Sequence, residues 1–497
     1  MTGGEDLVRA RLAEGPAGFL LGEKSGVPAE DGRTIEVDDP STGTPIGSVA
    51  AAGQSDVDNA VSVAAAAVED RRWSVKHPGK KALALARLGE LIDEHADELA
   101  YWEALDGGIP IALGPLQAYA ASGLCQYYSG WPSRLYGDLN PLVHNFHAYT
   151  LREPVGVVAV LVPWTQPLVT TLLRVLPALA AGNCVILKPS RRAPFSALRV
   201  AELAMEAGLP PGVLTVLTGD GPSTGAALAA HPGVDLVTYA GPTGPGVAVH
   251  GLAARTPGKR VLLQLGSTNA AVVFADADLG TAALAVASSV WQVAGQLPNA
   301  CGRLLVHRSV HDEVVERVAE QLGTPKIGSA LDQDTRMGPL ISAAHRKHVL
   351  DAVALAEAGG AAAVLRGRIP DGPGYLLTPT LLTAETEAAV VATRELAGPV
   401  LTVLPFDDDE HAVRLANSGG GAIGAGLWTS DVVRVHRLAP RLRAGSVWVN
   451  VHGLMDGSAP YGGAGGSGLG RDGGQEWIHS YTDAKAVYVG LGPEPPR

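Results

Sequence analysis

The stretch 291–303, WQVAGQLPNACGR, combines two glycines, a proline and a cysteine, a composition typical of a loop that presents a reactive side chain. A thiolate is a strong nucleophile, so Cys301 is a candidate for covalent chemistry. Cys301 follows Pro298 by three positions, which is up to roughly 10 Å along an extended chain. Because of this distance, Pro298 and Cys301 cannot both occupy the position in the loop where a nucleophile would be needed.

Strand-like apolar runs alternate with helical patterns between residues 155 and 241. Strands are expected at 155–164, 184–190, 212–219 and 234–241, with helices at 170–182 and 193–208. This alternation predicts right-handed βαβ units and a parallel sheet with helices on both faces. Ligands of such sheets bind at the carboxyl ends of the strands. The chain places Trp164, Lys188, Gly219 and Gly241 at those ends.

A second α/β series is expected from about 267 to 466. Its strands are predicted at 270–275, 303–308, 400–406 and 445–450. The glycine-rich segment 461–475 follows no strand-then-helix arrangement of the dinucleotide-binding type, and a lone glycine run is a weak phosphate signal. We therefore expect this segment to pack as a loop near the domain interface.

Composition limits the class of protein. A chain of 497 residues exceeds one ordinary core, so two or three domains are expected. The formal net charge of −12 argues against nucleic acid or an anionic membrane as a partner. The three cysteines are few and far apart, which favours a reducing cytoplasm over a disulfide framework. No secretory signal or membrane span is expected from the apolar runs.

Nine collinear motifs carry a resemblance to a known family. In order they are DPSTGTPIGSV, REPVGVVAVLVPWTQPL, AGNCVILKPS, GLPPGVLTVLTG, YAGPTGPG, LQLGSTN, GQLPNACGR, ELAGPV and PYGGAGGSGLGRDGG. Over nearly its full length the chain resembles the aldehyde dehydrogenase superfamily. The resemblance implies the α/β aldehyde dehydrogenase fold: a Rossmann-like NAD(P)-binding domain over 1–135 and 155–266, a catalytic-type domain over 267–466, and a β-hairpin oligomerisation arm over 136–154 and 480–490. The arm segment 144–154 alternates as an edge strand would, and it is expected to pair between subunits.

The resemblance also implies which residues should do the chemistry. In that family a cysteine attacks the aldehyde, and an asparagine side chain and the cysteine N–H hold the oxyanion. The family pattern is Gly-Gln-x-Cys with an arginine five positions later. Gly295, Gln296 and Arg303 match it, and Pro298 stands at the cysteine position. Proline has neither a thiol nor a backbone N–H.

Two further positions depart from the family in the same direction. At the position of the family's oxyanion-binding asparagine this chain has Thr165, whose hydroxyl is shorter and points differently. At the position of the general-base glutamate it has Gln264, an amide that cannot take a proton at neutral pH. A lysine of the following helix is replaced by Arg174, which keeps the positive charge. Cys301 is either a relocated nucleophile or a small buried residue, and we favour the second interpretation, as for Cys125 and Cys184.

The cofactor positions that the resemblance implies are half retained. Trp164, Lys188, Gly241, Gly246 and Glu395 match the family. A serine is replaced by Pro242 and an aromatic residue by Ala397, which predicts weak binding of NAD or NADP. The family's glutamate that binds the adenosine ribose is replaced by Arg191, which could pair with a 2′-phosphate and slightly favours NADP. No metal site is expected.

Two function classes remain open at this point. The first is a non-catalytic family member, a structural or regulatory subunit that assembles as a homodimer or homotetramer, or with an active aldehyde dehydrogenase. The second is an active NAD(P)-dependent oxidoreductase that uses unusual groups, such as Cys301 or a bound water. Simultaneous loss at three distant positions favours the first class.

Overall fold

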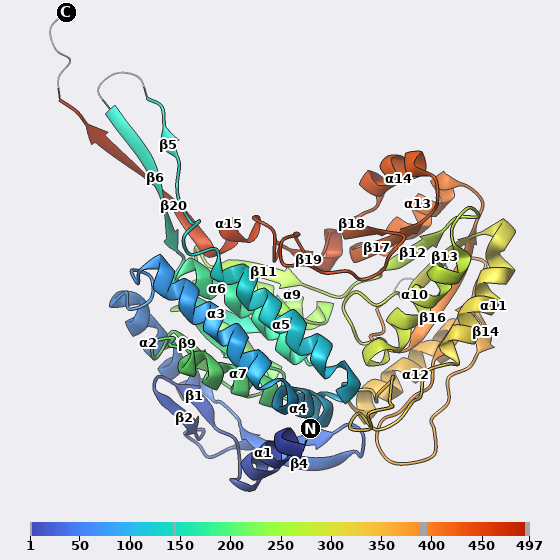
Figure 1. Cartoon of the computed structure of the whole chain (residues 1–497), viewed down its shortest axis with the longest axis horizontal. Helices are drawn as coiled ribbons and strands as arrows, with labels where there is room; N and C mark the ends of the chain where they lie inside the picture. Colours follow the sequence, from blue (N-terminus) through green and yellow to red (C-terminus); the bar gives the residue numbers. More distant parts are fainter. Residues whose placement is uncertain (1, 143–145, 388–394, 493–497) are drawn as a thin grey trace, which may run out of the picture.

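Two mainly parallel sheets dominate the computed structural model, which describes residues 2–142, 146–387 and 395–492 (Figure 1). The first sheet has eight strands in the order β19-β11-β10-β7-β8-β9-β1-β2. Their bounds are β1 Phe19–Leu21, β2 Lys24–Val27, β7 Val157–Leu161, β8 Cys184–Lys188, β9 Leu214–Val216, β10 Leu236–Ala240, β11 Arg260–Gln264 and β19 Gly468–Leu469. The predicted βαβ region lies in this sheet, where β9, β8, β7, β10 and β11 run parallel.

Helices cover both faces of the first sheet. They are α1 Thr2–Ala13, α2 Gln54–Glu69, α3 Pro78–Glu94, α4 Ala96–Gly107, α5 Gly114–Ser129, α6 Pro167–Ala181, α7 Phe195–Glu206, α8 Ala226–Ala230, α9 Thr243–Ala253 and α15 Trp477–Tyr481. The predicted helices 170–182 and 193–208 correspond to α6 and α7. A small antiparallel pair, β3 Thr34–Asp39 and β4 Thr44–Ala50, packs beside α4.

The second sheet has seven strands in the order β14-β15-β16-β13-β12-β17-β18. Their bounds are β12 Ala270–Val273, β13 Arg303–His307, β14 Ala362–Leu365, β15 Thr380–Thr383, β16 Val400–Phe406, β17 Ala422–Trp428 and β18 Ala444–Val449. Its helices are α10 Leu279–Trp291, α11 His311–Leu322, α12 Ala343–Ala358, α13 Asp409–Asn417 and α14 Val432–Leu438. Alternate residues of β12 enter different cores, Ala270 and Val272 on one face and Ala271 and Val273 on the other. Both faces of this sheet are therefore buried, as expected of parallel strands.

The glycine-rich segment 461–475 packs between the two sheets. Within it, β19 pairs antiparallel with β11 of the first sheet. The N–H of Ala464 donates to the carbonyl of Ala422 at 3.0 Å, and β17 begins at Ala422 in the second sheet. The segment thus contacts both sheets and includes β19, whereas the domain division and its limits remain a prediction.

A three-stranded antiparallel sheet projects away from the two larger sheets (Figure 1). It consists of β5 Leu139–Asn140, β6 Phe146–Pro154 and β20 Thr482–Gly490. The prediction that 144–154 forms an edge strand was wrong for its described part, because β6 lies in the middle with β20 on one side and β5 on the other. The edges of this sheet belong to β5 and β20. Residues 144 and 145 lie outside the described part of the chain.

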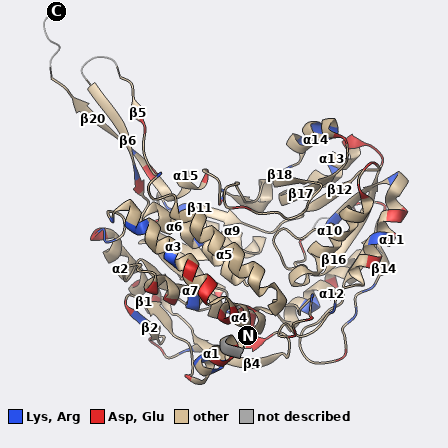
Figure 2. Ribbon diagram, in the orientation of Figure 1, with Lys and Arg blue, Asp and Glu red and all other residues tan. Residues whose placement is uncertain are grey.

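Charge is unevenly distributed over this arm (Figure 2). Arg152, Glu153, Asp483 and Lys485 lie at its base, whereas 146–151 and 486–492 carry no charged residue. None of the described helices is both long and apolar enough to cross a membrane.

Candidate active site

Nine residues singled out from the sequence line one cavity of about 200 Å³. They are Trp164, Thr165, Gly241, Pro242, Gln264, Gln296, Pro298, Glu395 and Ala397. The first five lie at the carboxyl ends of β7, β10 and β11, and the last four precede β13 and β16 of the second sheet. The two sheets therefore bring together residues far apart in the sequence, at the strand ends where α/β sheets bind ligands.

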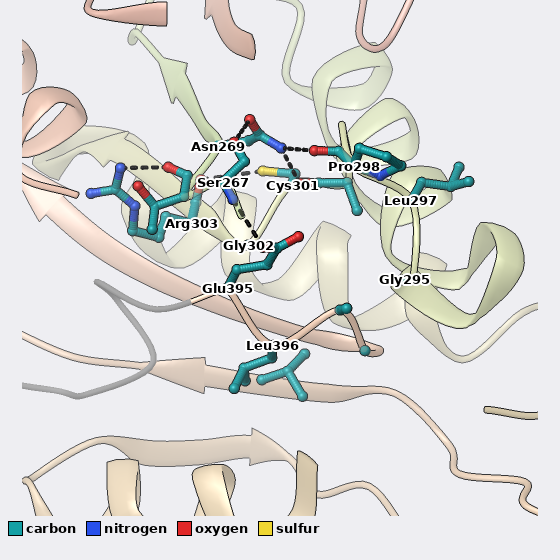
Figure 3. Close-up of a pocket in the computed structure, with 15 residues that line it drawn as sticks. Ser267, Asn269, Gly295, Leu297, Pro298, Cys301, Gly302, Arg303, Glu395 and Leu396 are labelled. Atoms are coloured by element: carbon teal, nitrogen blue, oxygen red, sulfur yellow. Dashed lines mark hydrogen bonds between the residues drawn. The ribbon is translucent and has the colours of Figure 1, made fainter. Parts of the chain in front are cut away.

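Pro298 and Cys301 both line a small pocket of about 30 Å³ (Figure 3), but only Pro298 of the two also lines the larger cavity. Pro298 lines the cavity, and its carbonyl accepts a hydrogen bond from the Asn269 side chain at 2.8 Å (Figure 3). Cys301 is 2% exposed and packs in the core between α10 and β12. Its N–H donates to Ser289 Oγ at 3.1 Å, and its thiol donates to the Arg303 carbonyl at 3.2 Å. Burial raises the pKa of Cys301 to about 12, so the reactive thiolate is disfavoured at neutral pH.

The loop that leads to Pro298 keeps an unusual backbone. Val293 and Ala294 have φ angles of 49° and 53°, a left-handed conformation that costs energy for any residue with a Cβ atom. Gly295 follows with a φ of 69°, and a Cβ atom here would lie 2.3 Å from the carbonyl oxygen of Gly398. Gln296 fixes the loop further, because its Oε1 accepts from the Ile341 N–H at 3.0 Å. The backbone just before Pro298 is therefore strained, as the backbone of active-site loops often is.

A hydrogen bond from a buried arginine fixes the side chain of Gln264. The guanidinium of Arg174, in α6, donates to Oε1 of Gln264. The same guanidinium forms an ion pair with Asp472 at 3.2 Å and donates to Thr238 Oγ1 at 3.2 Å. Arg174 and Asp472 are 3% and 2% exposed, so their charges depend on each other. Asp472 was missed in the sequence, where only the glycines around it drew notice.

Thr165 lies in a turn that a second buried carboxylate supports. Gln166 has a φ of 46°, and α6 begins at Pro167. The Leu168 N–H at the start of α6 donates to Glu103 Oε1 at 2.6 Å. Burial raises the pKa of Glu103 to about 7, since α4 carries this carboxyl group into the protein interior. The sequence analysis missed Glu103 because the residues around it match no pattern that indicates a chemical role.

Glu395 directs its carboxylate toward the chain after β11. Its Oε2 accepts from the Ser267 N–H at 3.0 Å (Figure 3). The surrounding atoms raise the pKa of Glu395 to about 7 by desolvating the carboxylate, although the residue as a whole is exposed. Within the described residues, no three His, Cys, Asp or Glu side chains are grouped so that they could hold a metal ion.

Comparison with known proteins identifies the architecture. The profile of the aldehyde dehydrogenase family matches residues 27–487. The chain belongs to the aldehyde dehydrogenase family. It is 38% identical over 475 residues to the NADP/NAD-dependent aldehyde dehydrogenase PuuC of Escherichia coli, covering 95% of each chain. It is 36% identical over 473 residues to the phenylacetaldehyde dehydrogenase of Pseudomonas fluorescens, covering 93% of this chain and 94% of that one.

Solved structures of aldehyde dehydrogenases share the fold. The NAD⁺ complex of the aldehyde dehydrogenase from Bacillus cereus superposes with a TM-score of 0.95 at 34% identity, and the match covers 98% of this chain and 99% of that chain. The aldehyde dehydrogenase from Sinorhizobium meliloti gives a TM-score of 0.94 at 34% identity, over 98% and 97% of the two chains. The fold class that the motifs predicted is confirmed.

The remaining cofactor candidates of this aldehyde dehydrogenase family member lie outside the cavity lining. Lys188 ends β8, and its Nζ donates to the Pro189 carbonyl at 2.9 Å. Burial lowers the pKa of Lys188 to about 8, with a smaller contribution from Arg191 in the same direction. Arg191 is exposed. Gly246 lies in α9, which begins directly after β10 at the end where Gly241 lines the cavity.

Two histidines complete the cavity wall and had no sequence signal. His345 and His348 lie near the start of α12 and line the cavity with Ala397. The Nε2 of His345 bonds the Ala397 carbonyl at 2.7 Å, and its ring meets Trp164 edge-on with centroids 5.8 Å apart. Burial lowers the pKa of His345. The segment AAHRKH matches no ligand pattern by itself, so only the fold reveals its place.

Proposed function

We propose that this chain is an aldehyde dehydrogenase family protein that has lost aldehyde oxidation and acts as a structural or regulatory subunit. Pro298 carries the proposal, because it lines the cavity at the position of the family's nucleophile and supplies neither a thiol nor an N–H. The one cysteine nearby, Cys301, is buried with its thiol bonded to a carbonyl. The attack on an aldehyde carbon therefore has no nucleophile in this loop.

The steps that would follow the attack are also unsupported. Gln264 carries no charge, and its carbonyl oxygen is already engaged by Arg174. An amide in this arrangement cannot accept a proton from water. Thr165 offers a hydroxyl in place of the family's asparagine amide, so one oxyanion donor is altered and the other is lost at Pro298.

We further propose that a dinucleotide binds to the retained half of the site. Trp164, Gly241 and Glu395 line the cavity, and Lys188 ends the neighbouring strand β8. The start of α9 offers backbone N–H groups suited to a pyrophosphate. Pro242 and Ala397 reduce the contacts, so we propose weak binding of NAD or NADP. The positive charge of Arg191 slightly favours NADP.

The projecting arm supports the proposal of an assembly. Its exposed apolar residues include Leu139, Phe146, Tyr488 and Leu491. An apolar surface and a strand edge on one arm favour pairing with another chain. We propose a homodimer or homotetramer, or a hetero-oligomer with an active aldehyde dehydrogenase, in the cytoplasm. The net charge of −12 argues against nucleic acid and membrane partners.

The alternative is an active NAD(P)-dependent aldehyde dehydrogenase that uses non-standard groups. The observation that favours it is the joint presence of Trp164, Gly241 and Glu395 at one cavity. A working enzyme would still need a nucleophile or an activated water there. The surroundings of Cys301 and Gln264 supply neither.

An activity assay separates the two functions. The purified chain is incubated with an aliphatic or aromatic aldehyde and with NAD or NADP in millimolar excess, so that weak cofactor binding does not limit the rate. We expect no aldehyde-dependent reduction of either cofactor above the protein-free background. Oxidation at the rates of ordinary family members would refute the proposal.

A further inference from the structure

The segment that leads into α3 and the first half of α3 are basic in a chain that is acidic as a whole. Between residues 71 and 89 the sequence contains six lysines and arginines and no aspartate or glutamate, whereas the formal net charge of the chain is −12. The six are Arg71, Arg72, Lys76, Lys80, Lys81 and Arg87. Positive charge concentrated at one place on a negatively charged protein attracts anionic groups to that place.

A groove of about 430 Å³ lies between α3 and the end of α7. Leu83 and three alanines form the apolar part of its wall, and Lys76, Lys80 and Arg87 form most of the polar part. Leu83 is 71% exposed, so its side chain is available for contact. The groove shares no lining residue with the cavity that contains Pro298, so its use does not depend on the chemistry of that cavity.

Two of the three cations in the groove are available to a partner. Lys80 is exposed and forms no ion pair with any described residue. The Nζ of Lys76 lies 5.7 Å from the centre of the Trp73 ring, and it likewise has no carboxylate partner in the described part of the chain. Arg87 is paired with Glu90 at 3.0 Å, so the Glu90 carboxylate is already engaged and leaves the charges of the two lysines uncompensated.

An acidic peptide fits this groove better than a lipid surface or a nucleic acid does. A bilayer would meet a projecting surface rather than a hollow one, and two free lysines are few for a run of phosphate contacts. Helical peptides commonly dock with apolar anchors in a groove. We propose that this groove binds an acidic segment of another polypeptide, with a large apolar side chain against Leu83 and carboxylates beside Lys76 and Lys80.

The two kinds of contact should leave different marks on binding. Leu83 would supply affinity, because contact with an apolar side chain of the partner removes its surface from water. Lys76 and Lys80 would select the sign of the partner's charge and make binding depend on salt, since salt screens exposed charges. The combination predicts a partner that needs both apolar and acidic side chains.

Synthetic peptides and the purified full chain test this by fluorescence anisotropy. The acidic probe is an amphipathic helical peptide with leucines on one face and glutamates on the other. In one control peptide lysines replace the glutamates, and in a second control alanines replace the leucines. At low salt we expect the acidic probe to bind roughly tenfold more tightly than either control. Molar salt should weaken its binding.

Two variants assign the binding to the groove. Leu83→Ala removes the apolar contact and should weaken the acidic probe roughly tenfold. Lys80→Glu reverses one charge and should weaken it severalfold, while the lysine-containing control peptide should lose less or gain. Both positions are exposed, so both variants should fold. Leu284→Ala on α10 and Lys24→Glu on β2, also at exposed positions, are the matched controls and should bind as the wild type does.

Four results would overturn the inference. They are no binding of the acidic probe, equal binding of the acidic and basic peptides, binding that the alanine-containing peptide shares, and binding that Leu83→Ala and Lys80→Glu leave unchanged. Sedimentation with vesicles of phosphatidylserine and phosphatidylcholine is measured alongside. Sedimentation of the wild type that Lys80→Glu abolishes, without binding of the acidic probe, would assign the surface to anionic lipid instead.

Discussion

In the proposed loss of aldehyde oxidation, Pro298 would remove two catalytic groups at once. The thiol and the N–H of the family's cysteine act on opposite ends of the same carbonyl group, and proline has neither. Cys301 does not compensate, since its thiol donates to the Arg303 carbonyl inside the core. The sequence predicted a buried Cys301 three positions after Pro298, and the Cys301 side chain is indeed 2% exposed.

Arg191 leads to a prediction about the cofactor. The resemblance implies that its exposed guanidinium takes the place of the family's ribose-binding carboxylate, so we expect a 2′-phosphate to gain a charged partner. At low salt, calorimetry should give NADP an affinity about threefold to tenfold above that of NAD, the range of a partly exposed ion pair. Arg191→Glu should reverse the order, and the exposed Arg134→Glu should not. Tight NAD binding with much weaker NADP in the wild type would refute this role of Arg191.

Among the elements, α6 connects the cavity to the C-terminal segment. It begins after Thr165 and carries Arg174, which contacts β10, β11 and Asp472 together. Removing one member of a buried ion pair leaves an uncompensated charge. The helix position is therefore coupled to a residue almost 300 positions later in the chain.

Arg174→Met should lower the stability of the protein by roughly 3–5 kcal/mol, because Asp472 would remain buried without its partner. A double-mutant cycle compares the urea midpoints of four proteins. These are the wild type, Arg174→Met, Asp472→Asn and the variant that carries both substitutions. We expect the double variant to be more stable than the sum of the single effects predicts. Additive effects would show that the two charges do not depend on each other.

The sequence predicted the strands with the longest continuous apolar runs, but it missed β11, β14 and β15 as well as a strand that glycines interrupt. The segment 422–428, AIGAGLW, forms β17, which lies between β12 and the edge strand β18 of the second sheet. Glycine is unfavourable in a strand interior, but a Cβ atom on Gly424 would lie 2.0 Å from the Trp448 ring of β18. That contact, like the Arg174–Asp472 pair and the histidines of α12, joins distant segments and has no local pattern.

For the whole molecule, we expect the projecting arm to mediate association with other chains. The exposed side chains of Leu139, Tyr488 and Leu491 are 70%, 68% and 66% exposed. Such residues on a strand edge are a liability unless another chain covers them. A structural or regulatory role would use this surface, since it does not depend on the cavity.

Light scattering at micromolar concentration should show a dimer or tetramer of the 51.0 kDa chain. Tyr488→Asp with Leu491→Asp should shift it toward smaller species, because buried charge at an interface is costly. Leu83→Asp, at a residue 71% exposed on α3, is the matched control and should leave the size unchanged. A wild type that is only monomeric would contradict an arm-mediated assembly.

The intact mass of the protein after exposure to aldehyde and excess NAD or NADP tests the central claim most directly. The wild type should gain no acyl group and form no reduced cofactor, and Cys301→Ala should behave identically. Pro298→Cys should gain one acyl group with at most a single turnover, because Gln264 cannot activate the water that releases it. Acylation of the wild type that Cys301→Ala abolishes would contradict the account, since Cys301 would then be the nucleophile.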